Sequence, residues 1–251
     1  MLVFAFIVPH WMPWEEIQHP LLAYSCLVGS VSSWIGSATY HVFMTHANGE
    51  PLYVHLLQWD VVGIWVTQAL GAATTIYTSV HCYSDTVRLT MITCYVLASV
   101  ASLRDSLTAR SAWSRILGFA SLFLLRIIAF GLRVADPATL SGGSVSPLSA
   151  TRTLPSSTPL SLAYTMRREQ PLIHVVMQEA WAVVGSVISA TRVPERWFPG
   201  SFDYLFNSHN VMHVFVVLGA WHMVAAARAD LLWLATGDAC SRSSTLAPLA
   251  S

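Results

Sequence analysis

The last strongly apolar stretch of the chain covers residues 204–227 and reads YLFNSHNVMHVFVVLGAWHMVAAA. It contains no Asp, Glu, Lys or Arg. It is also long enough to cross a bilayer, because the hydrocarbon core is about 30 Å thick and an α-helix rises about 1.5 Å per residue. The stretch predicts a membrane-spanning helix, and with it a helical membrane protein.

Five other stretches of the chain also read as membrane spans. They are residues 17–49, 61–84, 89–103, 116–132 and 171–191. The first two contain no charged side chain, whereas the last two contain Arg126 and Glu179. Ionisable residues occur in spans when they are paired, and these two stand at similar distances from one membrane boundary, so we expect an interhelical ion pair.

The first residues of the chain, 1–8, are apolar but too few to cross a membrane. They lack the basic region and the cleavage site of a signal peptide, and we interpret them as the remnant of a truncated first helix. The prediction is an all-α, seven-transmembrane bundle that forms a single domain over residues 1–251.

The amino-acid composition indicates that lipid surrounds most of the protein. Only 10% of the 251 residues are charged and 54% are hydrophobic, whereas a soluble domain carries about a quarter charged residues. Thirteen Lys and Arg balance thirteen Asp and Glu, so no basic surface is available for nucleic acid. The four cysteines contain no CxxC pair, and the sequence suggests neither a disulfide scaffold nor a thiolate zinc site.

The connections between the spans predict a mobile loop and an orientation. Residues 133–168 are rich in Ser, Thr and Pro, and we expect them to stay mobile because they cannot bury enough apolar surface. The loops at 104–115 and 192–203 share one side of the membrane and carry several arginines, which indicates the cytosolic side. These arginines are Arg104, Arg110, Arg115, Arg192 and Arg196.

His209 and His213 open the last span with a spacing of four residues, so both imidazoles lie on one helix face and can bind one ion. His222 lies about half a turn away from that face, and we exclude it as a ligand. Taken alone, the pair is also compatible with two polar residues that pack inside a bundle.

A second polar cluster favours the metal interpretation. Ser37 and His41 share a face near the end of one span, and Asp60 opens the next. Alternating topology brings these residues and the start of the last span to the same membrane boundary. Three histidines with an open fourth position are typical of a catalytic zinc site, in which the metal lowers the pKa of its bound water to about 7.

Each residue of this cluster has a candidate role and a plainer alternative. His41, His209 and His213 are the predicted ligands of Zn²⁺. Asp60 is the candidate general base, although a carboxylate at a helix N-terminus is also favoured by the helix dipole. Ser37 could orient the ligand, although serine in membrane helices commonly bonds its own backbone. Haem fits less well, because an i, i+4 pair cannot take opposite axial positions, and calcium or magnesium would need more oxygen ligands.

Three motifs together resemble the progestin and adipoQ receptor family. They are Ser37-Ala38-Thr39-Tyr40-His41-Val42-Phe43, Asp60 followed by Gly63, and Pro194-Glu195-Arg196-Trp197-Phe198-Pro199-Gly200-Ser201-Phe202-Asp203-Tyr204 running into Asn207-Ser208-His209 and His213. The resemblance implies a seven-helix bundle with a cytosolic N-terminus and a zinc ion near the cytosolic face, held by His41, His209 and His213 with Ser37 and Asp60 beside it. Asn210 stands where the family usually has Gln.

The resemblance also implies a function. Family members are associated with hydrolysis of ceramide to sphingosine and a fatty acid, and some with adiponectin or progestin signalling. The expected location is the Golgi or plasma membrane. The leading hypothesis is a zinc-dependent hydrolase of ceramide-like lipid amides with a possible receptor role. The alternative is a non-enzymatic receptor or scaffold with a structural zinc. A third hypothesis, proton or ion transport, would need a polar path beyond Asp60.

Overall fold

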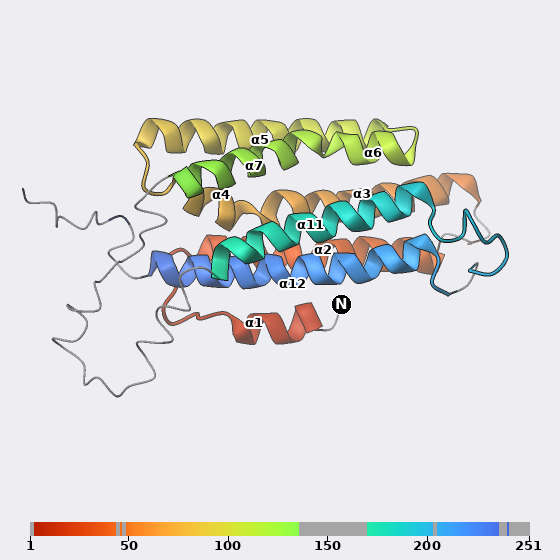
Figure 1. Cartoon of the computed structure of the whole chain (residues 1–251), viewed down its shortest axis with the longest axis horizontal. Coiled ribbons are helices and arrows are strands. Elements are labelled where there is room, and N and C mark those ends of the chain that lie inside the picture. The colour runs from red at the N-terminus through yellow and green to blue at the C-terminus, as the bar shows by residue number, and fades with distance from the viewer. Residues whose placement is uncertain are drawn as a thin grey trace, which may run out of the picture.

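The computed structural model describes residues 3–43, 46, 49–135, 170–202, 205–235 and 240, and every regular element in these ranges is helical. A π-helical turn, Val3–Ile7, leads into the first α-helix. The α-helices are α1 (Val8–Trp11), α2 (Pro20–Phe43), α3 (Glu50–Gly71), α4 (Ala73–Val80), α5 (Asp85–Thr108), α6 (Ala112–Gly118), α7 (Ala120–Ala135), α11 (Gln170–Thr191) and α12 (Ser208–Leu234). Figure 1 shows the long helices running roughly along one axis, with α5 on one side, α1 on the other, and α2 and α12 between them.

Four helices in the described ranges are long and apolar enough to cross a membrane. They are Pro20–Phe43, Asp85–Thr108, Leu172–Thr191 and Ser208–Leu234. The predicted spans at 61–84 and 116–132 are each divided, the first at Ala72 between α3 and α4 and the second at Phe119 between α6 and α7. Four of the spans predicted from the sequence therefore match these helices, and the two breaks were missed.

The prediction that Asp60 opens a helix is wrong. Helix α3 begins at Glu50, where Gly49 has a φ of 73° and Pro51 occupies the first turn. A proline in the first turn costs no hydrogen bond, because the N–H groups there have no partner inside the helix. Asp60 therefore lies in the interior of α3.

The bundle buries many small polar side chains and exposes large apolar ones. Ser30, Thr74 and Ser79 are fully buried, whereas Leu89 and Leu97 of α5 are 68% and 64% exposed. Small residues inside and apolar residues outside are typical of a bundle in a lipid bilayer, because membrane helices associate through small residues that let their backbones approach closely. The exposed leucines provide the apolar surface that faces the acyl chains.

Glycines allow α2 and α3 to pack closely as an antiparallel pair. A Cβ at Gly36 would lie 2.6 Å from the Trp59 carbonyl oxygen and 3.1 Å from the Asp60 Cα, and a Cβ at Gly63 would lie 2.7 Å from the Ser32 carbonyl oxygen. The Ser32 hydroxyl also lies 3.2 Å from the Gly63 carbonyl oxygen. This close approach places Asp60 level with the turn of α2 that carries Ser37.

The N-terminal helical segment packs against two of the long helices. Phe4, Val8 and Met12 are buried with Cys26 of α2 and Val224 of α12. A second apolar core lies between α4, α5 and α7. The first of these cores joins residues from both ends of the chain, so α12 is held in the middle of the bundle.

Arg133 and Asp230 form a buried ion pair that the sequence did not predict. The Arg133 Nη1 and Nη2 atoms lie 3.0 and 2.5 Å from the two carboxylate oxygens of Asp230, and the Thr78 hydroxyl donates to the same carboxylate at 3.0 Å. Arg133 thus belongs to α7, and its assignment to a mobile loop at 133–168 is wrong. Residues 136–169 lie outside the described part of the chain.

A disulfide joins Cys82, which follows α4, to Cys240, which follows α12, with their Cα atoms 5.2 Å apart. Cysteine spacing suggested no disulfide scaffold, and it did not reveal this single disulfide. The two cysteines are 158 residues apart, so only the tertiary structure brings them together. Helix α12 separates this disulfide from the histidines at its opposite end.

Candidate metal centre

Three histidines from two helices meet at one end of the bundle. His41 lies near the end of α2, and its Nε2 atom is 2.8 Å from Nε2 of His209 at the start of α12. Nε2 of His213 lies 3.1 Å from Nε2 of His209. One ligand atom from each residue lies within 4.8 Å of the others, so the three imidazoles could hold one metal ion.

The donor set fits a transition metal. A neutral imidazole nitrogen offers either one proton or one lone pair, yet Nε2 of His209 faces two other Nε2 atoms. Three lone pairs that converge on a cation would satisfy all three nitrogens at once. Imidazole favours zinc and its neighbours over calcium and magnesium, which prefer oxygen ligands.

Capping interactions at the start of α12 orient His209 and His213. The Asn207 side chain accepts a hydrogen bond from the Asn210 N–H at 2.9 Å. The Glu195 carboxylate accepts from the Ser208 N–H at 2.7 Å and also from the Ser208 hydroxyl. These bonds satisfy N–H groups that have no partner inside the helix. They therefore stabilise the first turn of α12 and hold the two histidines in place.

Glu195 is held in its charged form. Partial burial raises the pKa of its carboxyl, but the hydrogen bonds from Ser208 and the charge of Arg192 outweigh that effect and leave the pKa below its ordinary value. The negative charge also lies at the positive end of the α12 dipole. Glu195 therefore stabilises the helix start beside the histidines, a role that its position in a loop did not reveal.

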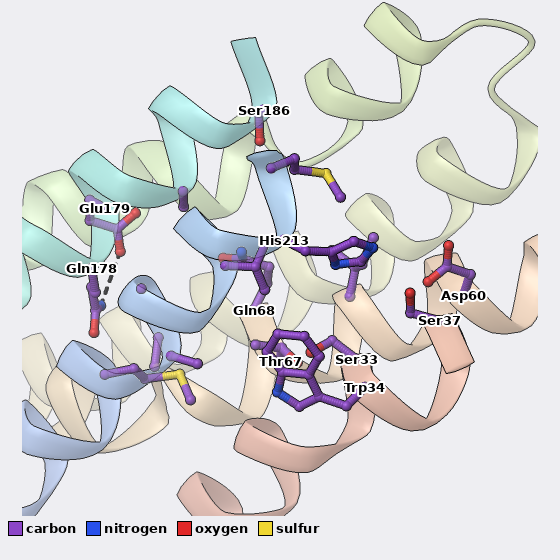
Figure 2. Close-up of a pocket in the computed structure, with 18 of the residues that line it drawn as sticks. Ser33, Trp34, Ser37, Asp60, Thr67, Gln68, Gln178, Glu179, Ser186 and His213 are labelled. Atoms are coloured by element: carbon purple, nitrogen blue, oxygen red, sulfur yellow. Dashed lines mark hydrogen bonds between the residues drawn. The ribbon is translucent and has the colours of Figure 1, made fainter. Parts of the chain in front are cut away.

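Asp60 and Ser37 lie beside the histidines on the wall of a cavity of about 170 Å³. His209 and His213 line the same cavity. Figure 2 shows Ser37 and Asp60 together at one side of this cavity, with the His213 ring between them and the rest of the space. The tertiary structure thus brings all the predicted site residues to one region, with His41 joined to it through its contact with His209.

The other end of the cavity is also polar. The predicted ion pair between Arg126 and Glu179 is confirmed, with Arg126 Nε 2.7 Å from Glu179 Oε1. Both residues line the cavity together with Gln178. The sequence indicated neither the cavity beside this pair nor the place of Gln178 on its wall, because nothing in the apolar pattern of two separate spans reveals a shared cavity.

Two further histidines of the long helices pair with each other. Nδ1 of His174 on α11 lies 2.7 Å from Nδ1 of His222 on α12. The metal-competent cluster among the described residues consists of His41, His209 and His213. The exclusion of His222 from this cluster is therefore confirmed.

These observations define a class, a helical membrane protein with a three-histidine site at one end of its bundle. The chain belongs to the haemolysin-III-related family, which it matches over residues 1–224. It is 31% identical to progestin and adipoQ receptor family member 4 of Homo sapiens, over 96% of this chain and 78% of the relative. It is 28% identical to heptahelical transmembrane protein ADIPOR3 of Oryza sativa, over 84% and 46% of the two chains. The family match and these relatives confirm the resemblance to the progestin and adipoQ receptor family that the three motifs indicated.

Proposed function

We propose that the protein is a zinc-dependent hydrolase of ceramide-like lipid amides that crosses the membrane seven times. Six of the crossings would be α2, α3 with α4, α5, α6 with α7, α11 and α12, and the short N-terminal segment that ends in α1 would belong to the seventh. The observation that carries the proposal is the meeting of three histidines with a carboxylate on the wall of a cavity inside a membrane bundle.

The side chains of the cluster suit amide hydrolysis. His41, His209 and His213 would hold the zinc, which when bound supplies a Lewis acid and an acidified water. Asp60 would take a proton from the attacking water and pass it to the nitrogen of the leaving amine. Water adds to the carbonyl carbon and the C–N bond breaks, so the products are a fatty acid and a long-chain amine.

The cavity suits a lipid substrate. Its wall includes apolar residues such as Ile64, Val216 and Met223, which would surround acyl chain and limit access of bulk water. Ser37 lies beside Asp60 and would orient the amide or the water. We place the protein in the Golgi or plasma membrane, with the histidine end toward the cytosol.

Metal content and ceramide turnover, measured together on purified protein, test the proposal. The wild-type protein is expected to contain about one zinc and to release sphingosine. His209→Ala should abolish both properties, and Asp60→Ala should abolish turnover while zinc is retained. Turnover by metal-free protein would refute the proposal.

A receptor or scaffold with a structural zinc is the alternative. It would be supported if the zinc-loaded wild-type protein binds lipid but releases no product. It would be supported further if Asp60→Ala leaves every measured property unchanged.

A further inference from the structure

His41 joins the candidate metal centre from the last turn of α2, which ends at Phe43. The first turn of α12, which carries His209, is held by side-chain hydrogen bonds to Asn207 and Glu195. Helix ends fray where their free backbone groups lack such partners. The position of the His41 imidazole therefore depends on what else holds the end of α2.

The closest contact between α2 and α3 lies further back along α2. A Cβ at Gly36 would lie 2.6 Å from the Trp59 carbonyl oxygen, so the two backbones touch there. His41 follows Gly36 by five residues, which corresponds to a rise of about 7.5 Å along the helix. A second contact, nearer to the end of α2, is needed to hold the turn that carries His41.

Two tyrosines provide that contact. The Tyr40 hydroxyl donates to the Tyr53 hydroxyl at 3.1 Å, and the two rings meet edge to face with their centroids 5.6 Å apart. Tyr53 lies in the first turn of α3, which begins at Glu50, and its own N–H donates to the Gly49 carbonyl. The tyrosine pair therefore ties the last turn of α2 to the first turn of α3.

The Tyr40 ring also contacts the imidazole of His41. The ring centroids are 4.9 Å apart and the planes are inclined by 68°, an edge-to-face arrangement that is favourable at this distance. Neighbouring side chains on a helix do not normally face each other, so the two rings have turned toward one another. The His41 ring contacts His209 and His213 as well, with centroids 4.7 and 5.9 Å away. Tyr40 and the two histidines thus limit the rotation of His41.

We infer that Tyr40 and Tyr53 are positioning residues for His41 in the metal centre. Tyr40 restrains the imidazole, and Tyr53 restrains Tyr40 through the hydroxyl pair. Residues that orient a metal ligand raise metal affinity, because the ligand then loses less freedom when the metal binds. Neither tyrosine is a catalytic residue. The inference rests on the proposed function only in taking His41 as a metal ligand.

Metal affinity and coordination geometry, measured on the purified full chain in detergent, test the inference. Zn²⁺ affinity comes from competition with a chelator of known affinity, and the visible absorption of bound Co²⁺ reports the geometry. Tyr40→Phe keeps the ring and removes the hydroxyl. It is expected to weaken Zn²⁺ binding about three- to tenfold, the factor typical of one net hydrogen bond, and to alter the Co²⁺ spectrum.

Tyr53→Phe is expected to have the same two effects, because it removes the other half of the hydroxyl pair. The double variant should bind Zn²⁺ no more weakly than either single variant, since one hydrogen bond joins the two hydroxyls. Losses that add in the double variant would overturn the role of the pair.

Tyr83→Phe is the matched control. The Tyr83 hydroxyl donates to the Leu132 carbonyl at 2.8 Å, and Tyr83 follows the disulfide-bonded Cys82 at the end of the bundle opposite to the histidines. This variant should keep the Zn²⁺ affinity and the Co²⁺ spectrum of the wild type, whatever its melting temperature. The inference is overturned if Tyr40→Phe and Tyr53→Phe also keep both properties. It is overturned equally if Tyr83→Phe loses as much Zn²⁺ affinity as they do.

Metal binding and turnover separate this inference from the proposed function. If the two tyrosine variants bind Zn²⁺ more weakly but the zinc-loaded wild type releases no sphingosine, the inference stands and the hydrolase proposal fails. If the wild type releases sphingosine and both variants bind Zn²⁺ as tightly as it does, the hydrolase proposal stands and the inference fails.

Discussion

Nε2 of His41 lies 2.8 Å from Nε2 of His209, although 168 residues separate them in the chain. His41 is brought there by the packing of α2 against α12, and His209 by the caps at the start of α12. A metal held at this point ties two helices together, so its binding and the stability of their contact are coupled.

His41→Ala is therefore expected to weaken metal binding strongly, because it removes a metal ligand. Loss of a residue that only hydrogen-bonds a ligand costs ~10–100-fold in metal affinity, and the loss here should be larger. The substitution should also abolish the rise in melting temperature that added Zn²⁺ produces in the wild type. Metal analysis and thermal unfolding in detergent measure both effects. His222→Ala is the control and should keep the zinc; equal metal loss from the two variants would argue against the assigned ligands.

Gly36→Ala is expected to destabilise the protein by about 1–3 kcal/mol, the usual cost of overpacking. The added Cβ would lie 2.6 Å from the Trp59 carbonyl oxygen, which is backbone and cannot move aside alone. Gly131→Ala is the matched control, because a Cβ there has nothing within 4 Å, and it should stabilise α7 by up to ~1 kcal/mol. Thermal unfolding of the two variants compares them, and similar melting temperatures would mean that α2 and α3 are less closely packed.

Asp230→Asn is expected to cost about 3–5 kcal/mol, because it leaves the buried Arg133 guanidinium without its carboxylate. Asp85→Asn offers a comparison within the same chain. Asp85 pairs with Arg88 but its side chain is 90% exposed, so that change should cost no more than ~1 kcal/mol. Denaturation of the two variants measures the difference, and comparable losses would show that the Asp230 pair is solvated.

Glu195→Gln is expected to lower stability in a pH-dependent way. The pKa of Glu195 is depressed in the folded protein, so its contribution is present above the ordinary carboxyl pKa of about 4.3 and is lost as pH falls through the lower folded value. Melting temperatures of metal-free wild type and variant should therefore differ near neutral pH and converge under acid conditions. A difference that stays constant with pH would contradict the role of the charge.

The Cys82–Cys240 disulfide is expected to lie on the oxidising side of the membrane, opposite to the histidines, because disulfides persist in oxidising compartments. In sealed vesicles of known orientation, a membrane-impermeant maleimide should label these cysteines only after reduction and only from that side. Cys82→Ser should label at Cys240 without reduction. Labelling of Cys82 from the cytosolic side would reverse the assigned orientation.

The amino-acid sequence alone predicted the helical class and the shared face of His209 and His213. It also predicted four spans that the length and composition of the helices confirm. These features depend on local hydropathy and on the 3.6-residue period, both of which are visible in short windows. Alternating topology then placed His41, from a distant span, at the same membrane boundary. The Arg126–Glu179 pair was predictable because its two charges stand at matching depths in successive apolar stretches.

The tertiary structure alone decided the place of Asp60 inside α3, the Arg133–Asp230 pair and the Cys82–Cys240 disulfide. Each of these depends on how closely two helices approach and at what relative height. Backbone contact at glycines such as Gly36 sets that approach. Hydropathy reports only that a segment prefers lipid to water, so it carries no information on which turn of one helix faces which turn of another.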